Sequence, residues 1–225
     1  MKSGNEYRCK KKELIWNFYR EGKVLCNKVI KTNDHDFESY AEGKIVPHGI
    51  YDVKDNSGYI TLWTSKDTSE LSCDSLYEWW DTRWKKEYIN ATSILLLMDW
   101  WGSNASNSYL FKNDIQNLVN KIRIPIRIAH YPPYTSKYNP IEHRLFCHIN
   151  RTCEWVIFSD VEVVHETYLK TKTSTGLSVD VRVNNKTYET WRKLNKETKK
   201  SIKEKIKFDD KLSKWNYTIF PEQLG

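Results

Sequence analysis

Two carboxylates in this sequence stand where they could hold a metal ion. Glu142 follows Asn139, a good helix N-cap, and Pro140, a good first helical residue, so the spacing predicts that Glu142 lies in the first turn of a helix. It shares a helix face with Leu145 and Phe146, which should turn toward the protein. Two readings stay open: a capping box in which Glu142 reaches back to the Asn139 backbone, or a metal ligand.

Asp99 is the second carboxylate. It ends the apolar run at 93–99, which is typical of a strand buried on both faces. The carboxyl ends of such strands are where ligands gather in open α/β sheets, although an Asp there can also simply hydrogen-bond the following turn. Both interpretations of Asp99 remain open on local sequence.

The hydrophobic pattern places these residues in an α/β domain. The turn signal at 55–58 predicts a hairpin, and the aromatic-rich segment at 68–86 should pack on the sheet. Antiparallel strands followed by a strand–helix–strand unit predict a mixed sheet flanked by helices. Strands are expected at 24–30, 45–52, 58–64, 93–99, 124–130 and 177–183, and helices at 68–86, 104–121 (capped by Asn104), 139–151, 160–170 and 196–206.

Several segments together resemble a known family. The series DWWGSN, SYLFKNDIQNL and HYPPYTSKYNPIEHRLFCHI is similar to the catalytic half of a DDE transposase of bacterial insertion sequences, of the Rhodopirellula type. KKKELIWNF, NDHDF, GKIVPHGIYDV, TKTSTGLSV and WNYTI resemble the same family in the same order, so the likeness spans roughly residues 9–220.

The resemblance implies an RNase H-like fold in which two Asp and one Glu hold two Mg²⁺ or Mn²⁺ ions. Such ions, about 3.5–4 Å apart, support hydrolysis at transposon ends and strand transfer into target DNA. By position, Asp99 matches the second Asp and Glu142 matches the Glu, which makes both catalytic and metal-binding candidates. The implied partner is DNA, at transposon ends and target.

The first acid of the family pattern is missing. The family reads VDxKKKEL, whereas this chain has Tyr7 and then Arg8 before Lys10. An arginine cannot deprotonate, so it should repel a cation rather than bind one. Asp34, Asp36 and Asp52 are the acids that could substitute, but the first two lie in an expected loop and the third in a later strand.

Only seven residues precede Arg8, so we expect a truncated opening strand. We expect an RNase H-like catalytic domain at 1–171 and a C-terminal extension packed on it at 172–225. Trp100 and Trp101 replace the small residues that the family has after Asp99, and their rings should narrow the site, although an aromatic could also stack on a splayed base. His130 either orients a phosphate or satisfies a loop carbonyl; we favour the carbonyl.

A net charge of +7 and a pI near 9.0 suit a polyanionic partner. The mixed Lys and Glu run at 192–207 is more typical of a solvated helix face than of a DNA-reading surface. The expected DNA-binding residues are Lys10, Lys11, Lys12, Lys137, His143 and Arg144.

Five scattered cysteines without a C-x-x-C pair favour a reducing compartment, and we expect a cytoplasmic protein with no membrane segment. A rival zinc site could be built from His143, Cys147, His148 and Cys153, but their spacing does not place them on one face. The alternative is that His143 supports Glu142 or contacts DNA, and that Cys147 is a packed residue.

Three functions remain. The first, which we favour, is a DDE transposase catalytic domain whose phosphodiester chemistry is impaired by Arg8. The second is a non-catalytic DNA-binding or regulatory remnant that forms homo-oligomers or pairs with an intact transposase. The third is a decayed fragment without function.

Overall fold

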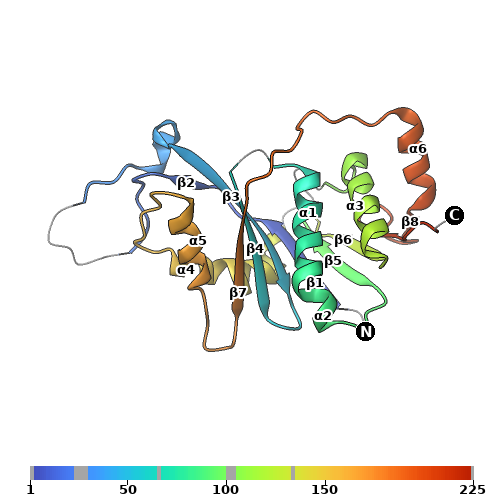
Figure 1. Cartoon of the computed structure of the whole chain (residues 1–225), viewed down its shortest axis with the longest axis horizontal. Helices are drawn as coiled ribbons and strands as arrows, with labels where there is room; N and C mark the ends of the chain where they lie inside the picture. The colour runs from blue at the N-terminus through green and yellow to red at the C-terminus, as the bar shows by residue number, and fades with distance from the viewer. Residues whose placement is uncertain (1–2, 23–29, 65–66, 100–104, 133–134, 224–225) are drawn as a thin grey trace.

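A computed structural model of the chain describes residues 3–22, 30–64, 67–99, 105–132 and 135–223. Its centre is one mixed sheet in the order β7-β4-β3-β1-β5-β6-β9-β8, with β2 paired to β3 (Figure 1). The strands are β1 (Ser3–Cys9), β2 (Glu13–Ile15), β3 (Gly43–Asp52), β4 (Ser57–Trp63), β5 (Ile94–Met98), β6 (Ile126–His130), β7 (Ser178–Asn184), β8 (Lys207–Phe208) and β9 (Asn216–Ile219).

Two groups of helices pack on the sheet, each around its own apolar core. One core joins β1, β5, β6 and β9 to α1 (Ser69–Trp79), α3 (Tyr109–Ile122) and α6 (Lys196–Lys205). The other joins β3, β4 and β7 to η5 (Glu142–Phe146), α4 (Cys147–Thr152) and α5 (Val161–Leu169). Since neighbouring residues of β3 point to opposite faces, Ile50 enters the first core and Tyr51 the second.

Short elements complete the chain. A π-helical turn, η2 (Trp80–Trp84), and α2 (Lys85–Glu87) continue α1, so the aromatic-rich helix runs from residue 69 to 87. Trp79 and Trp84 are buried against the sheet, which confirms the packing role expected for this helix. Two 3₁₀ turns, η1 (His35–Tyr40) and η4 (Ser136–Tyr138), lie in connections.

Most predicted elements are confirmed, including the hairpin, in which β3 and β4 are antiparallel around residues 53–56. The predicted start of the helix at 104 is wrong: α3 begins at Tyr109, where the Ser108 side chain accepts the Phe111 N–H and caps the helix. Asn104, Trp100, Trp101 and nearly all of the expected strand at 24–30 lie outside the described residues. Strands β2, β8 and β9 and both 3₁₀ turns were not predicted.

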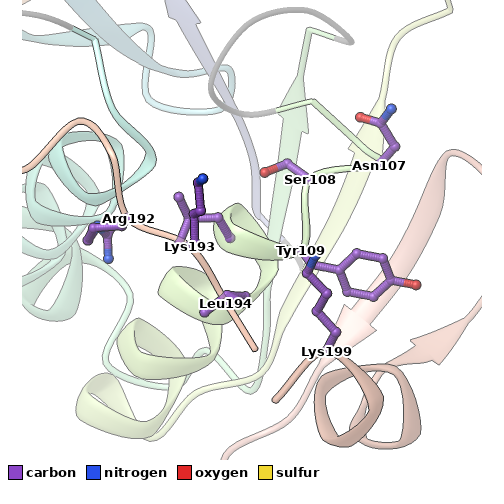
Figure 2. A pocket seen from close by; sticks show the side chains of 8 residues that line it. Asn107, Ser108, Tyr109, Arg192, Lys193, Leu194 and Lys199 are labelled. Carbon is purple, nitrogen blue, oxygen red and sulfur yellow. The ribbon is translucent and has the colours of Figure 1, made fainter. Parts of the chain in front are cut away.

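The extension after residue 171 adds strands at both edges of the sheet. β7 pairs in parallel with β4, and β9 pairs antiparallel with β6. Between them, Arg192 makes a bidentate pair with Asp114 of α3 at 3.0 and 2.6 Å. Figure 2 shows Arg192, Lys193 and Leu194 beside the start of α3, where they line a pocket of about 370 Å³. The boundary at 171 remains a prediction.

No helix among the described residues is both long and apolar enough to cross a membrane.

Candidate active site

The register of two central strands brings Arg8 beside Asp99. β1 runs parallel to β5, and their last pair is Tyr7 with Met98, so Arg8 is the next residue of β1 and Asp99 directly follows β5. Although only seven residues precede Arg8, β1 pairs with every residue of β5. Arg8 and Asp99 are thus neighbours at the carboxyl ends of two parallel strands.

The Arg8 guanidinium lies between the two predicted metal ligands. Its Nε is 2.8 Å from Asp99 Oδ2 and 2.9 Å from Glu142 Oε1. All three side chains are largely shielded, with 20%, 29% and 34% of their surfaces exposed. The structure therefore brings Asp99 and Glu142 together, as predicted, but around a fixed positive charge.

A third acid, Glu6, lies on the same face of β1 as Arg8 because side chains alternate along a strand. It is 1% exposed, and its Oε2 accepts the Ile141 N–H at 2.8 Å. Burial raises the pKa of the Glu6 carboxyl to about 7, and the negative charges of Asp99 and Glu142 add to that rise. Sequence reasoning missed Glu6, although its position two residues before Arg8 was a usable signal.

Glu6 also changes how the helix at 140–152 begins. Helical backbone starts at Pro140, as predicted, but the Asn139 side chain does not cap it. Asn139 Nδ2 instead donates to Asp99 Oδ1 at 2.9 Å, while Glu6 accepts a free N–H of the first turn. The hypothesis that Glu142 reaches back to the Asn139 backbone in a capping box is wrong, because the Glu142 carboxylate pairs with Arg8 instead.

The first turns of this helix are seated directly on β3. A Cβ on Gly49 would lie 2.7 Å from the Phe146 ring and 3.2 Å from Ile141 Cδ1, so only glycine lets the helix approach this closely. Gly49 is the register partner of Arg8 on β1. This contact fixes how far Glu142 lies from Arg8.

Other predictions about single residues are settled by hydrogen bonds. His130 Nδ1 lies 3.1 Å from the Asp99 backbone carbonyl, which confirms the loop-carbonyl role and positions the residue that bears the carboxylate. Asp34 accepts from the Asp36 N–H, and Asp52 accepts from two N–H groups of its turn. None of the contacts found among the described residues joins these three acids to Arg8, so the idea of a substitute acid there is not supported.

The rival zinc site is not assembled. His143 Nε2 lies 2.7 Å from the Lys137 carbonyl, and the Cys147 thiol donates to the His143 carbonyl at 2.8 Å. Cys153 is buried in the second core. Among the described residues, these side chains do not form a group of converging metal ligands.

A groove of about 750 Å³ starts at Arg8 and Glu142 and continues past Lys11 and Lys12. Lys10 and Arg20 pair with Glu13 inside it, whereas Lys11 and Lys12 are exposed. The basic side chains that line the groove are Arg8, Lys10, Lys11, Lys12, Arg20 and Arg151, and the acidic ones are Glu13, Glu21, Glu142 and Glu154. Lys137, His143 and Arg144 are exposed outside it.

Comparison with known protein families decides the classification. Residues 7–221 match the family described as the Rhodopirellula transposase DDE domain. The chain belongs to this family. Comparison with curated proteins gives no match.

The DDE domain also resembles solved transposase structures. It matches the Mos1 transposase paired-end complex with left transposon end at a TM-score of 0.52 and 11% identity, covering 72% of this chain and 45% of that one. A pre-cleavage Mos1 transpososome matches at 0.50 and 11%, covering 73% and 46%. At this identity the likeness shows the fold, which is mixed α/β and RNase H-like. The chain spans slightly less than half the length of these transposases.

The metal ions implied by the family do not fit this arrangement. Asp99 and Glu142 both direct an oxygen at the same Arg8 nitrogen, and the other Asp99 oxygen is bound by Asn139. Arginine stays protonated at any pH a folded protein tolerates, so its charge opposes a divalent cation in the same space. The site thus has the two acids predicted from the resemblance, Asp99 and Glu142, with the Arg8 guanidinium between them.

Proposed function

We propose that this chain is a DDE transposase domain whose metal-dependent phosphodiester hydrolysis and strand transfer are impaired by Arg8. The observation that carries the proposal is the double ion pair of one guanidinium nitrogen with Asp99 and Glu142. Catalysis by two divalent ions requires those carboxylate oxygens for the metals. In this chain both carboxylates already have an oxygen paired with the Arg8 guanidinium.

The groove supports DNA as the partner of the domain. Lys11, Lys12 and Arg151 line it and form no salt bridge with an acid of the described residues, next to the site where a phosphodiester would have to lie. Lysine and arginine gain from releasing counterions at phosphates, so binding should weaken as salt rises. Lys137, His143 and Arg144 are proposed to extend the contact outside the groove.

A second function is favoured by the same geometry. A domain that binds transposon ends without cutting them would act as a regulator, either as a homo-oligomer or paired with an intact transposase. The overall charge of +7 is as compatible with a DNA-binding regulator as with a catalytic domain. Salt-sensitive DNA binding without metal-dependent cleavage would distinguish the regulator from an active enzyme.

Nicking of supercoiled DNA with Mg²⁺ or Mn²⁺ tests the proposal. We expect no cleavage by the native chain, cleavage by Arg8→Asp, and none by Arg8→Asp combined with Glu142→Gln. Arg127→Asp is a matched control, because it makes the same charge change at a half-exposed residue of β6. Cleavage by the native chain that Glu142→Gln abolishes would contradict the proposed impairment.

DNA binding is measured separately with the same proteins. We expect Lys11→Glu with Lys12→Glu to weaken binding to duplex DNA, and the same change at the exposed Lys199 and Lys200, at the other end of the molecule on α6, to have little effect. Equal losses in both double variants would mean that total charge, not the groove, governs binding.

A further inference from the structure

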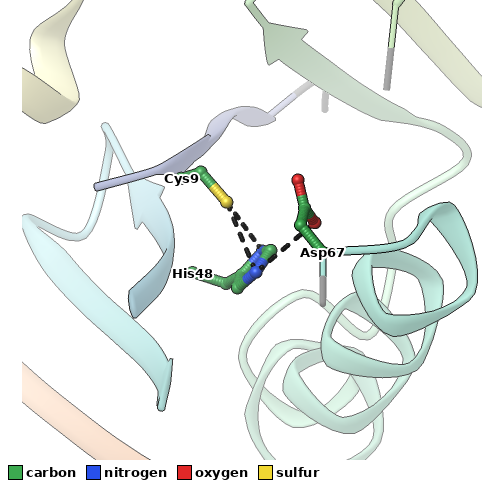
Figure 3. Close-up of side chains that lie close together, drawn as sticks. All are labelled: Cys9, His48 and Asp67. Carbon is green, nitrogen blue, oxygen red and sulfur yellow. Dashed lines mark hydrogen bonds and ion pairs between the residues drawn. The ribbon is translucent and has the colours of Figure 1, made fainter. Parts of the chain in front are cut away.

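Three potential metal ligands converge on the face of the sheet opposite Arg8. Figure 3 shows Cys9, His48 and Asp67 pointing toward one another from three separate segments. Cys9 and His48 are register partners on β1 and β3, and Asp67 lies in the connection between β4 and α1. We propose that these side chains form a binding site for Zn²⁺ or a similar borderline-soft divalent ion.

The distances suit a tetrahedral ion. Cys9 Sγ lies 3.3 Å from His48 Nε2, and His48 Nε2 lies 3.6 Å from Asp67 Oδ1. All three ligand atoms lie within 4.8 Å of one another. Zinc bonds of about 2.3 Å to sulfur and about 2.0–2.1 Å to nitrogen or oxygen place ligands roughly 3.3–3.6 Å apart. The spacings of His48 Nε2 from Cys9 Sγ and from Asp67 Oδ1 therefore match those of two ligands on one zinc ion.

Burial and a contact with Tyr7 fix the orientation of the His48 ring. His48 is 1% exposed; its Nδ1 contacts the Tyr7 hydroxyl and lies 3.2 Å from Cys9 Sγ, and its Nε2 is directed toward Asp67. Histidine ligands commonly use their second nitrogen in this way, to fix the ring and the tautomer. Asp67 is 32% exposed, so the fourth coordination position can be reached by water.

The donor set selects a different ion from that of the DDE site. Thiolate and imidazole favour zinc, whereas the family's carboxylates favour Mg²⁺ or Mn²⁺. Cys9 and Arg8 are adjacent on β1, so the two sites lie back to back across the sheet. An ion here would tie β1 to β3 and to the start of α1, directly behind Arg8.

Cobalt(II) titration of the EDTA-treated full chain tests the proposal, because cobalt bound to a thiolate gives a charge-transfer absorption that a carboxylate site cannot give. We expect one equivalent of Co²⁺ to produce this band, Zn²⁺ to displace it, and Zn²⁺ to raise the melting temperature. Cys9→Ser should abolish the band, and Asp67→Asn should weaken binding at least about tenfold.

Cys147→Ser is the matched control, because that cysteine is exposed on a different element. Its band should equal that of the native chain. Melting curves of each metal-free variant establish that it is folded before titration. A folded native chain that gives no band, or a band that survives Cys9→Ser, would overturn the proposal and leave Tyr7, Cys9, His48 and Asp67 as a set of polar contacts without an ion.

Discussion

Arg8 has the effect of a built-in counterion for two acids that would otherwise repel each other. The guanidinium thus lets Asp99 and Glu142 lie close together, and under the proposed function it also opposes a divalent ion there. The buried Glu6 lies on the same side of β1, and burial raises its pKa to about 7, so its carboxyl is only partly charged at neutral pH. At this scale the site is an ion-pair cluster in which one guanidinium nitrogen contacts both carboxylates.

The sequence predicts part of this cluster and not the rest. Asp99 and Glu142 could be found because each follows a recognisable local signal, an apolar strand or a helix start. The spacing of Glu6 from Arg8 could have placed it on the same face of β1, but not its contact with the Ile141 N–H, 135 residues away. Cys9 and His48 meet only through the register of β1 and β3, which local patterns do not show.

Lys112 of α3 offers a pH-dependent test of the core. It is 5% exposed, donates to the Ser106 carbonyl, and lies 5.0 Å from the centre of the Tyr217 ring. Burial lowers the pKa of its ammonium from 10.5 to about 8. Between these values the unfolded chain holds a proton that the folded chain has lost, so the free energy of unfolding gains a contribution that grows as pH rises.

We therefore expect the difference in free energy of unfolding between the native chain and Lys112→Met to shift in favour of the native chain by roughly 2–3 kcal/mol from pH 7.5 to 10.5. Urea unfolding at several pH values measures it. A difference that stays constant across this range would show that the Lys112 pKa is not lowered.

At the scale of elements, the contact between β3 and the helix at 140–152 positions the site. Local patterns predicted both elements, but not their distance, because that distance depends on Gly49 lacking a side chain under Phe146. Similarly, the start of α3 was misplaced because Ser108, rather than Asn104, caps it. Both Asn104 and Ser108 are residue types that can cap a helix, so the local sequence alone does not decide which of them begins α3.

Gly49→Ala should lower the free energy of unfolding by about 1–3 kcal/mol, because the new methyl group must displace the Phe146 ring. Gly43→Ala is the matched control on the same strand, where a Cβ would make ordinary contacts at 3.7 Å with Ile15. Denaturant unfolding compares the two. Equal losses would mean that the cost comes from the strand backbone and not from the helix contact.

At the scale of the whole molecule, the C-terminal segment completes the sheet. Tyr217 and Ile219 of β9 are buried in the first core, and Val179 and Val181 of β7 in the second. The sequence predicted β7 but not β9, whose four residues give too short a pattern to recognise. The mixed RNase H-like sheet was predictable, but its extension beyond β6 by β9 and β8 was not.

A chain ending at residue 171 should therefore lose cooperative unfolding and expose apolar surface, because β4 and β6 each lose a paired strand. Near-ultraviolet circular dichroism and thermal unfolding, with the full chain as control, measure this. A sharp transition in the shortened chain would instead support an independent domain at 1–171.

The most direct test of the ion-pair site formed by Arg8, Asp99 and Glu142 is a titration with Mn²⁺ in which electron paramagnetic resonance measures the bound ion. Cys9→Ser serves as the background, so that the thiol site on the opposite face does not contribute. We predict that the Cys9→Ser variant does not bind Mn²⁺, that adding Arg8→Asp to it creates binding, and that adding Glu142→Gln as well removes the binding again. Binding with Arg8 in place that Glu142→Gln abolishes would contradict the account.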